Sequence, residues 1–327
     1  MIQHRPLRVV LGEWQAEEAF HRAITTPVEL IPAPGLADDQ IAPLLADADA
    51  LVSRRFTAAM AANAPQLRLI HTPGAGTNEI DFAAVPSHTT VCNVYGHESS
   101  IAEYVFMTML ALNRDLLNMD RRFRQFDWSD RANGPQRDLS GRTLGIVGLG
   151  RIGREIARRA RVFGMRVIAA TRTPRSERAL ELDIARLVGM EELDSVLAET
   201  DFLVVAVPLD RDTTGLLGAR ELALLKPDAY LINVARGPVI DENALFEVLA
   251  DHRIAGAAID VWYQYPDDRV HGVPASRPFH ELDNAILTPH IAGWTFGTFA
   301  HRWERINDNL HRLANGLPLR DIVSPSH

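Results

Sequence analysis

Short apolar runs separated by amphipathic stretches recur along the whole chain. In the first hundred residues the runs are 7–11, 28–31, 50–52 and 67–71, and segment 16–24 behind the first run has helical spacing. Short apolar runs that alternate with helices are typical of buried strands in a parallel sheet. The amino-terminal third is therefore predicted to be an α/β unit.

A second cycle of the same kind begins after residue 140. Apolar runs occupy 143–147, 167–170, 202–207, 229–234, 255–261 and 285–287, and amphipathic helices are expected over 101–114 and 151–163. Strands spaced by helices in this way indicate a doubly wound α/β sheet. The chain is long enough, at 327 residues, for two such domains.

A glycine-rich turn joins the run 143–147 to the helix that follows. It reads Gly148, Leu149, Gly150, Arg151, Ile152, Gly153, with the glycines spaced as G-x-G-x-x-G. In dinucleotide-binding folds the first glycine permits the tight turn, the second admits the pyrophosphate, and the third allows close helix–strand packing. The helix amino terminus adds a partial positive charge for the phosphates. This turn is predicted to bind a dinucleotide.

The end of the next run bears on which dinucleotide binds. NAD sites usually carry an acidic residue about 20 residues beyond the glycines, but here Thr171, Arg172 and Arg175 follow the run. Arginines pair with a 2′-phosphate, and a carboxylate would repel it. NADP is therefore favoured over NAD, the alternative being that both arginines are solvated surface charges.

Composition and charge limit which classes of partner and which kinds of site are expected. The net charge of −8 disfavours nucleic acid, and the single Cys92 excludes an internal disulfide and a cysteine-based zinc site. No metal site is expected. No long apolar run is present, and the apolar stretch before Glu13 is too brief for a signal-peptide core. These features favour a cytoplasmic protein without a membrane segment.

Two side chains at the ends of later runs suggest the chemistry. Arg236 follows the run 229–234, where a guanidinium can hold a substrate carboxylate and polarise the adjacent carbonyl. His290 follows the run 285–287, where an imidazole can exchange the proton that accompanies hydride transfer. Either residue alone is weak evidence, since the chain has 12 histidines.

Several short motifs occur together and in one order. They are PGAGTN at 73–78, AE at 102–103, the glycine turn at 148–153, PL at 208–209 with TTG at 213–215, KP at 226–227, NVARG at 233–237 with DE at 241–242, GAAIDV at 256–261, and TPH at 288–290. Together they make residues 67–295 resemble the D-isomer-specific 2-hydroxyacid dehydrogenase family, in particular its glyoxylate/hydroxypyruvate reductases. The resemblance covers roughly two-thirds of the chain.

The resemblance implies a domain organisation. A Rossmann dinucleotide-binding domain would span 101–294, and a discontinuous, flavodoxin-like α/β substrate domain would combine 1–100 with 295–327. Members of the family are usually homodimers. The implied reaction is hydride transfer between NAD(P) and a small 2-oxo or 2-hydroxy acid. An alternative is a nucleotide-binding pseudoenzyme or a regulatory, co-repressor-like member of the same superfamily.

The resemblance also implies roles for individual residues. The backbone of Ala75, Gly76 and Thr77 would bind the substrate carboxylate together with Arg236, and His290 would be the catalytic acid/base. Further cofactor contacts would come from the ends of the later strands: Val207, Pro208, Ala235, Asp260, His290 and Gly293.

One position departs from the family pattern. A glutamate that bonds the histidine normally precedes the proline at 266, but Tyr265 stands there. A neutral phenol cannot raise a histidine pKa as a carboxylate does. Three alternatives follow: Tyr265 bonds His290 and the pH optimum moves down, another carboxylate such as Glu98 or Glu281 substitutes, or ordinary dehydrogenase activity is lost.

Overall fold

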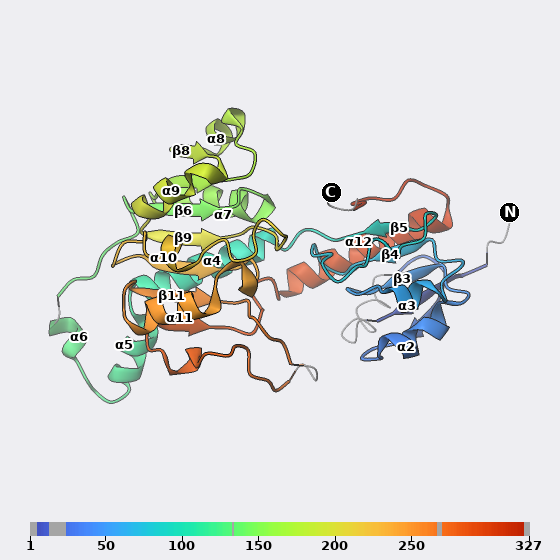
Figure 1. Ribbon diagram of the computed structural model, residues 1–327, viewed down its shortest axis with the longest axis horizontal. Coiled ribbons are helices and arrows are strands. Elements are labelled where there is room, and N and C mark those ends of the chain that lie inside the picture. Colours follow the sequence, from blue (N-terminus) through green and yellow to red (C-terminus); the bar gives the residue numbers. More distant parts are fainter. Residues whose placement is uncertain (1–4, 13–23, 133, 267–269, 324–327) are drawn as a thin grey trace. The chain divides into compact units, whose positions relative to one another are not determined.

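The computed structural model describes residues 5–12, 24–132, 134–266 and 270–323. The chain forms two compact units (Figure 1), one made of Met1–Gly96 with Thr295–His327 and the other of His97–Trp294. The helix expected over 16–24 falls almost entirely on residues 13–23, which lie outside the described residues.

The first unit is built on a five-stranded parallel sheet. Its strand order is β2-β1-β3-β4-β5, an order shared with flavodoxin-like folds. The strands are β1 (Leu7–Leu11), β2 (Val28–Pro32), β3 (Ala50–Val52), β4 (Leu69–His71) and β5 (Thr90–Cys92). The helices are α2 (Asp38–Ile41), the 3-10 turn η1 (Ala42–Leu45), α3 (Ala58–Ala61) and α12 (Phe296–Ala314).

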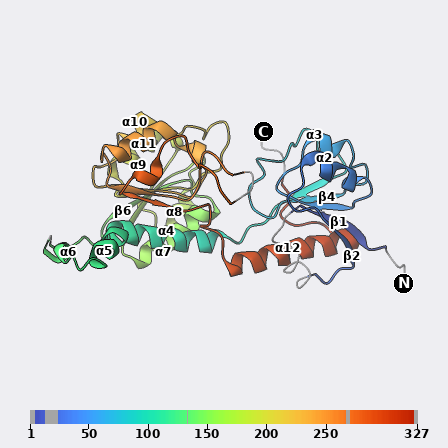
Figure 2. The same cartoon turned by 90° about the horizontal axis from the view of Figure 1, so that it is seen from below.

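The long helix α12 covers one face of this sheet, and α2 and α3 cover the other (Figure 2). Its buried residues Trp303, Ile306, Leu310 and Leu313 recur at helical spacing and pack against the first strand. Each such side chain contributes about 1.5–3 kcal/mol when fully buried. The return of the chain after residue 294 therefore completes the core of the first unit.

The second unit has a seven-stranded parallel sheet with the order β12-β11-β10-β9-β6-β7-β8. This is the doubly wound Rossmann arrangement, in which the strand order reverses at β6. The strands are β6 (Thr143–Val147), β7 (Arg166–Ala170), β8 (Arg186–Val188), β9 (Phe202–Val205), β10 (Tyr230–Asn233), β11 (Gly256–Ile259) and β12 (Ala285–Leu287). The predicted α/β fold class is confirmed.

Helices cover both faces of the second sheet. Figure 2 shows α4 and α7 on one face and α9, α10 and α11 on the other, each over its own apolar cluster. The helices are α4 (Glu98–Asn113), α5 (Leu116–Phe123), α6 (Ser129–Ala132), α7 (Arg151–Val162), α8 (Ser176–Leu182), α9 (Leu193–Glu199), α10 (Ala219–Leu222) and α11 (Glu242–Ala250). The 3-10 turns are η2 (Met190–Glu192), η3 (Gly237–Val239) and η4 (Phe279–Glu281).

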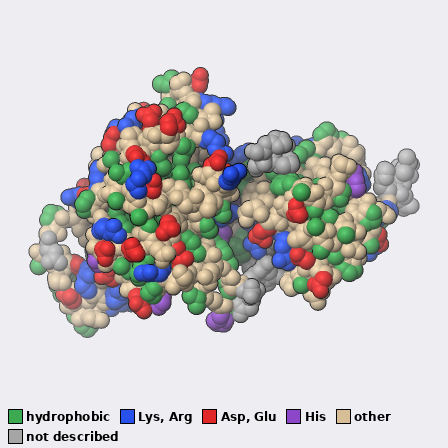
Figure 3. Space-filling model, in the orientation of Figure 1, with side chains coloured by type: hydrophobic (Ala, Val, Ile, Leu, Met, Phe, Trp, Pro, Cys, Tyr) green, Lys and Arg blue, Asp and Glu red, His purple; other side chains and the backbone are tan. Residues whose placement is uncertain are grey.

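The surface of the second unit mixes both charge signs. On the face drawn in Figure 3, basic and acidic side chains are interspersed rather than gathered by sign. Within the described part of the chain, no helix combines the length and apolar character that crossing a bilayer requires.

Candidate active site

The glycine turn lies at the carboxyl end of β6, where the sheet order reverses. Gly148 has φ +100°, and a Cβ built there would lie 2.7 Å from the carbonyl oxygen of Ala206. A Cβ on Gly153 would lie 2.2 Å from the carbonyl oxygen of Gly148. Only glycine fits at either position, because both approaches involve backbone atoms.

Gly150, unlike Gly148 and Gly153, has open space beside it, and this space bears on whether a dinucleotide fits the turn. Gly150 is the N-cap of α7 with φ −74°, and a Cβ there would meet nothing within 4 Å. Neither strain nor crowding within the protein therefore requires glycine at this position. Open space at the amino terminus of a helix that begins with Arg151 and Ile152 suits an approaching pyrophosphate. The turn fits the dinucleotide that its sequence implies.

Thr171, Arg172 and Arg175 follow β7, as expected. The side chains of both arginines are exposed, and Arg175 is the N-cap of α8. Arg172 also makes a contact that the sequence did not predict: its Nη2 donates to Asp210 Oδ2 at 2.7 Å. The pKa of Arg172 is raised because it bonds Asp210.

Val207 and Pro208 lie in the loop after β9, beside the glycine turn. The Val207 side chain is 2.8 Å from where a Cβ of Gly148 would stand. The Thr213 hydroxyl donates to the carbonyl oxygen of Pro208 at 2.6 Å. The predicted strand 202–207 therefore ends two residues early, at Val205, and leaves Val207 in the loop beside the glycines.

Arg236 is presented by a tight turn after β10. Asn233 shapes this turn, since its Oδ1 accepts from the Ala235 N–H at 3.1 Å and its Nδ2 donates to the Arg236 carbonyl at 3.3 Å. Arg236 is half-buried, and its Nη1 donates to the Ala235 carbonyl at 2.7 Å. A Cβ on Gly237 would lie 2.4 Å from the Trp262 carbonyl carbon. The turn is thus pressed against the segment that follows β11.

Asp260 follows β11 and organises the loop that carries His290. Its side chain is buried, and Oδ1 accepts from the Thr288 hydroxyl at 2.6 Å and the Ile291 N–H at 2.8 Å. Its Oδ2 accepts from the Ala292 N–H at 2.9 Å. Burial raises the pKa of Asp260, and these three hydrogen bonds oppose the rise. Sequence reasoning expected a cofactor contact at this position and missed its role as the anchor of the loop.

The anchored loop holds His290 in an uncommon backbone conformation. His290 has φ +59°, in the left-handed region that costs a non-glycine residue about 1–2 kcal/mol. The Trp262 indole N–H also donates to the Thr288 carbonyl, at 2.8 Å, and the Tyr104 hydroxyl lies 2.7 Å from the Thr288 hydroxyl. These bonds stabilise the loop in the conformation that presents the imidazole.

Tyr265 is a direct partner of the histidine. Its hydroxyl lies 3.0 Å from His290 Nδ1, and it also accepts the Trp262 backbone N–H at 3.1 Å. A phenol oxygen has two acceptor positions and one proton. It can therefore accept from a protonated imidazole or donate to a neutral one. The first of the three alternatives for Tyr265 corresponds to this contact.

The two carboxylates considered as substitutes occupy different elements. Glu98 is the first residue of α4. Glu281 lies exposed at the end of η4, 3.9 Å from its neighbour His280. Gly293 packs close to the start of α4, since a Cβ there would lie 3.5 Å from both His97 and Ile101.

The loop of Ala75, Gly76 and Thr77 belongs to the first unit, after β4. The Asn93 side chain donates to the Ala75 carbonyl at 3.0 Å, and the Val94 N–H donates to the Gly74 carbonyl at 3.1 Å. These bonds hold two loop carbonyls against the residues after β5. Gly76 is exposed at the tip.

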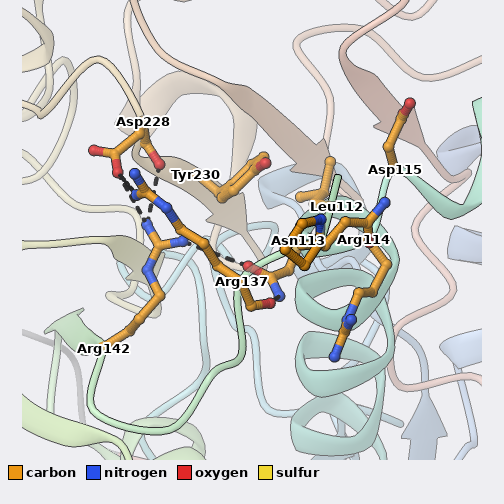
Figure 4. Close-up of a pocket in the computed structure, with 10 residues that line it drawn as sticks. Leu112, Asn113, Arg114, Asp115, Arg137, Arg142, Asp228 and Tyr230 are labelled. Carbon is orange, nitrogen blue, oxygen red and sulfur yellow. Dashed lines mark hydrogen bonds and ion pairs between the residues drawn. The ribbon is translucent and has the colours of Figure 1, made fainter. Parts of the chain in front are cut away.

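A separate hollow of about 300 Å³ lies at the opposite, amino-terminal edge of the second sheet (Figure 4). Arg137 and Arg142 both reach Asp228 across it, and Arg142 also stacks over the Phe202 ring at 4.9 Å. Because these arginines are already paired and the parallel strands end at the other edge, this hollow is not the candidate site.

Comparison with known proteins identifies the family. The family model for the NAD-binding domain of D-isomer specific 2-hydroxyacid dehydrogenases matches residues 106–292. The chain is 36% identical over 283 residues to the glyoxylate reductase of Thermococcus gammatolerans, covering 83% of this chain and 81% of that enzyme. A 2-hydroxyacid dehydrogenase structure from Ketogulonicigenium vulgare Y25 superposes with a TM-score of 0.83 at 27% identity, covering 99% of this chain and 100% of that one.

An acyclic imino acid reductase in complex with NADPH and D-Arg also superposes with a TM-score of 0.83, covering 97% of this chain and 100% of that one. At 23% identity this likeness concerns the fold alone. The family match and the glyoxylate reductase relative show an NAD(P)-dependent oxidoreductase that acts on CH–OH donors. The chain belongs to the D-isomer-specific 2-hydroxyacid dehydrogenase family.

Proposed function

We propose that this protein reduces a small 2-oxo acid to the D-2-hydroxy acid and prefers NADPH. Glyoxylate, hydroxypyruvate and bulkier analogues are the candidate substrates. The observation that carries the proposal is the anchored His290, whose Nδ1 is bonded by Tyr265 while Asp260 holds its loop. Such a fixed imidazole is suited to proton transfer at a carbonyl oxygen.

Each proposed residue has one task in the reaction. Arg236 holds the acid's carboxylate through paired N–H donors and polarises the adjacent carbonyl. We also assign substrate binding to the backbone N–H groups of Ala75, Gly76 and Thr77, which makes the first unit the substrate domain. A reduced nicotinamide, when bound, would supply the hydride for this reduction. His290 donates the matching proton to the carbonyl oxygen from Nε2, since Nδ1 is engaged by Tyr265.

Tyr265 takes over the positioning part of the missing glutamate's role. Its oxygen accepts from Trp262 and has a second lone pair for a protonated Nδ1–H. It therefore orients the imidazole before and after the proton leaves. It supplies no negative charge, so reduction is expected to be fastest below neutral pH.

The cofactor preference rests on the residues after β7. No carboxylate follows this strand directly, and Thr171, Arg172 and Arg175 stand where an NAD site usually has one. We assign the 2′-phosphate to the two arginines and the pyrophosphate to Gly150, Arg151, Ile152 and Gly153. Val207, Pro208, Ala235, Asp260 and Gly293 are proposed to border the rest of the dinucleotide.

We also propose that the protein is a cytoplasmic homodimer. The segment from α4 to α6 exposes large apolar side chains: Met107, Leu110, Leu116, Leu117, Phe123, Phe126 and Trp128. The α5–α6 part of this segment projects from the second unit (Figure 1), and its exposed apolar side chains favour a second copy as the partner. Cys92 is a buried free thiol, which suits a reducing compartment.

The proposed function is tested by following oxidation of NADPH and NADH with a panel of 2-oxo acids between pH 5 and 8. We expect turnover that favours NADPH and is lost in Arg236→Ala and His290→Ala, because each removes a group that contacts the acid. Arg277→Ala is the matched control, since this arginine lies over the Phe246 ring beyond the proposed site. Turnover that survives either site variant would overturn the assignment.

A further inference from the structure

An ion pair joins the two loops that border the proposed adenosine end of the cofactor site. Arg172 follows β7 and Asp210 follows β9, and the strands β7 and β9 flank β6 on its two sides. The Arg172 Nη2 lies 2.7 Å from Asp210 Oδ2 and 3.8 Å from Asp212 Oδ2. The pair thus bridges the loops on either side of the glycine turn.

Asp210 is fixed by its own loop. Its Oδ1 accepts the N–H groups of Asp212 at 3.0 Å and Thr213 at 3.1 Å, and its backbone N–H donates to the Thr213 hydroxyl at 2.8 Å. The hydrogen bond from Arg172 is the largest cause that lowers the pKa of Asp210, so the carboxylate is charged near neutral pH. One oxygen therefore caps the turn while the other faces Arg172.

Arg172 is less constrained than its partner. Its side chain is 62% exposed, whereas that of Asp210 is 31% exposed. A long exposed side chain can change rotamer at little cost, but the capped aspartate cannot leave without breaking its turn. A phosphate that binds Arg172 in its observed position therefore also lies close to a carboxylate that stays in place.

The charges on these two loops partly cancel. Arg172, Arg175 and Arg211 carry three positive charges, and Asp210 and Asp212 carry two negative charges. A 2′-phosphate gains from the arginines but is repelled by Asp210, on the order of tenfold in affinity for one nearby like charge in a partly exposed site. A dinucleotide without that phosphate meets no such repulsion.

We propose that Asp210 is a specificity-determining residue that moderates the preference for NADPH and keeps NADH usable. The β9 loop thereby supplies the carboxylate that the end of β7 lacks, and this carboxylate competes with the 2′-phosphate for Arg172. This inference rests on the proposed dinucleotide function. It explains why Arg172, which the sequence alone assigns to the 2′-phosphate, is paired with the carboxylate of Asp210.

The test measures dissociation constants of NADPH and NADH directly, by calorimetry at low ionic strength, for the wild type and Asp210→Asn. The asparagine keeps a side-chain oxygen for the turn and removes the charge. We expect the dissociation constant for NADPH to fall about tenfold and that for NADH to change less than about threefold. Asp212→Asn is the matched control, since it removes an equal charge from the same loop without breaking the 2.7 Å bond, and we expect less than about threefold.

The outcomes separate the inference from the proposed function. Unchanged or weaker NADPH binding by Asp210→Asn, with wild-type affinity measurable, overturns the inference and leaves the proposed function intact. Binding of neither nucleotide by the wild type overturns both. If Asp210→Asn does not fold, Asp210→Thr, which keeps an oxygen at the turn, gives the same comparison.

Discussion

Replacing Tyr265 with phenylalanine isolates what the phenol contributes to the proposed proton transfer. The change removes one hydroxyl and leaves the ring. That hydroxyl lies 3.0 Å from His290 Nδ1 and accepts the Trp262 N–H at 3.1 Å. During reduction the imidazole is protonated before the proton leaves, so the lost contact is a hydrogen bond from a charged donor.

The geometry sets the size of the effect. Hydrogen bonds to charged groups contribute about 1.5–3 kcal/mol. Tyr265 is 51% exposed, so water replaces part of the lost bond, and we take the lower part of this range, about 1.5–2 kcal/mol. This corresponds to a decrease in kcat of roughly 10- to 30-fold. KM for the oxo acid should change little, because Arg236 and the 75–77 loop are the groups proposed to bind it.

The assay is steady-state reduction of the best oxo acid by NADPH for the wild type and Tyr265→Phe. Tyr263→Phe is the control, because it removes a hydroxyl from the same segment that donates to the Ile240 carbonyl at 3.0 Å and does not bond the histidine. We expect the control to retain kcat. An unchanged kcat in Tyr265→Phe, or an equal loss in both variants, would refute the positioning role.

The opposite perturbation is Tyr265→Glu, which restores a carboxylate beside His290. A negative charge within about 4–6 Å favours the imidazolium and raises the pKa of a histidine by about 1–3 units. Because reduction needs the protonated form, the alkaline fall of the reduction rate should move to higher pH by a similar amount. A pH profile identical to that of the wild type would contradict this.

Three further predictions concern the glycine turn, the loop of His290 and a buried histidine of the first unit. Gly150→Ala should weaken NADPH binding at least about tenfold and change the free energy of unfolding by less than about 1 kcal/mol. Gly153→Ala should instead lower the melting temperature, because its Cβ would collide with backbone atoms and that of Gly150→Ala would not. An equal fall in the melting temperature of both variants would contradict this. Asp260→Asn should lower the free energy of unfolding by about 2–3 kcal/mol and reduce kcat, because the amide N–H₂ would face backbone N–H donors. A variant as stable as the wild type in urea denaturation would contradict this prediction. Burial lowers the pKa of His71 to about 4, whereas the pKa in the unfolded chain is near 6.5. Between pH 7.5 and pH 5 the unfolded chain therefore takes up a proton that the folded protein does not, and about 2 kcal/mol of unfolding free energy should be lost. His71→Gln should unfold in urea with a smaller pH dependence than the wild type.

The sequence predicts the fold best where apolar runs are fully buried. The run 143–147 matches β6, whose five residues are all buried, and the run 50–52 matches β3, whose three residues are all buried. The short strands β5 and β8 were not predicted, because each has three residues and begins with a polar one. Pairing with β4 and β7 makes them strands, and that contact is not visible in the local sequence.

Helix α5 was missed for a different reason. None of its residues is buried, and at eight residues it is too short for a helical period to be recognised in the sequence. The expected helix over 101–114 instead spans Glu98–Asn113, because a hydrophobic pattern does not mark the first turn of a helix.

The sequence predicts which residue types form the candidate site, but it does not predict the hydrogen bonds and ion pairs that hold them in place. Arg236 and His290 stand at strand ends, a position that the sequence shows directly. The bonds from Asp260 to the His290 loop join residues about 30 positions apart, and Arg172 and Asp210 are separated by 38 positions. No spacing rule connects such pairs in a parallel sheet, so only the structure reveals that Asp260 anchors the loop and that Asp210 engages the arginine.

Hydride transfer to the α-carbon of a 2-oxo acid can be followed with an isotope label on the nucleotide. NADPH carrying deuterium at the transferable ring position is incubated with hydroxypyruvate, and the product is examined by NMR and chiral chromatography. We expect D-glycerate with one deuterium at C2, formed by the wild type and absent with His290→Ala. A product without deuterium at C2, or the L isomer, would contradict it.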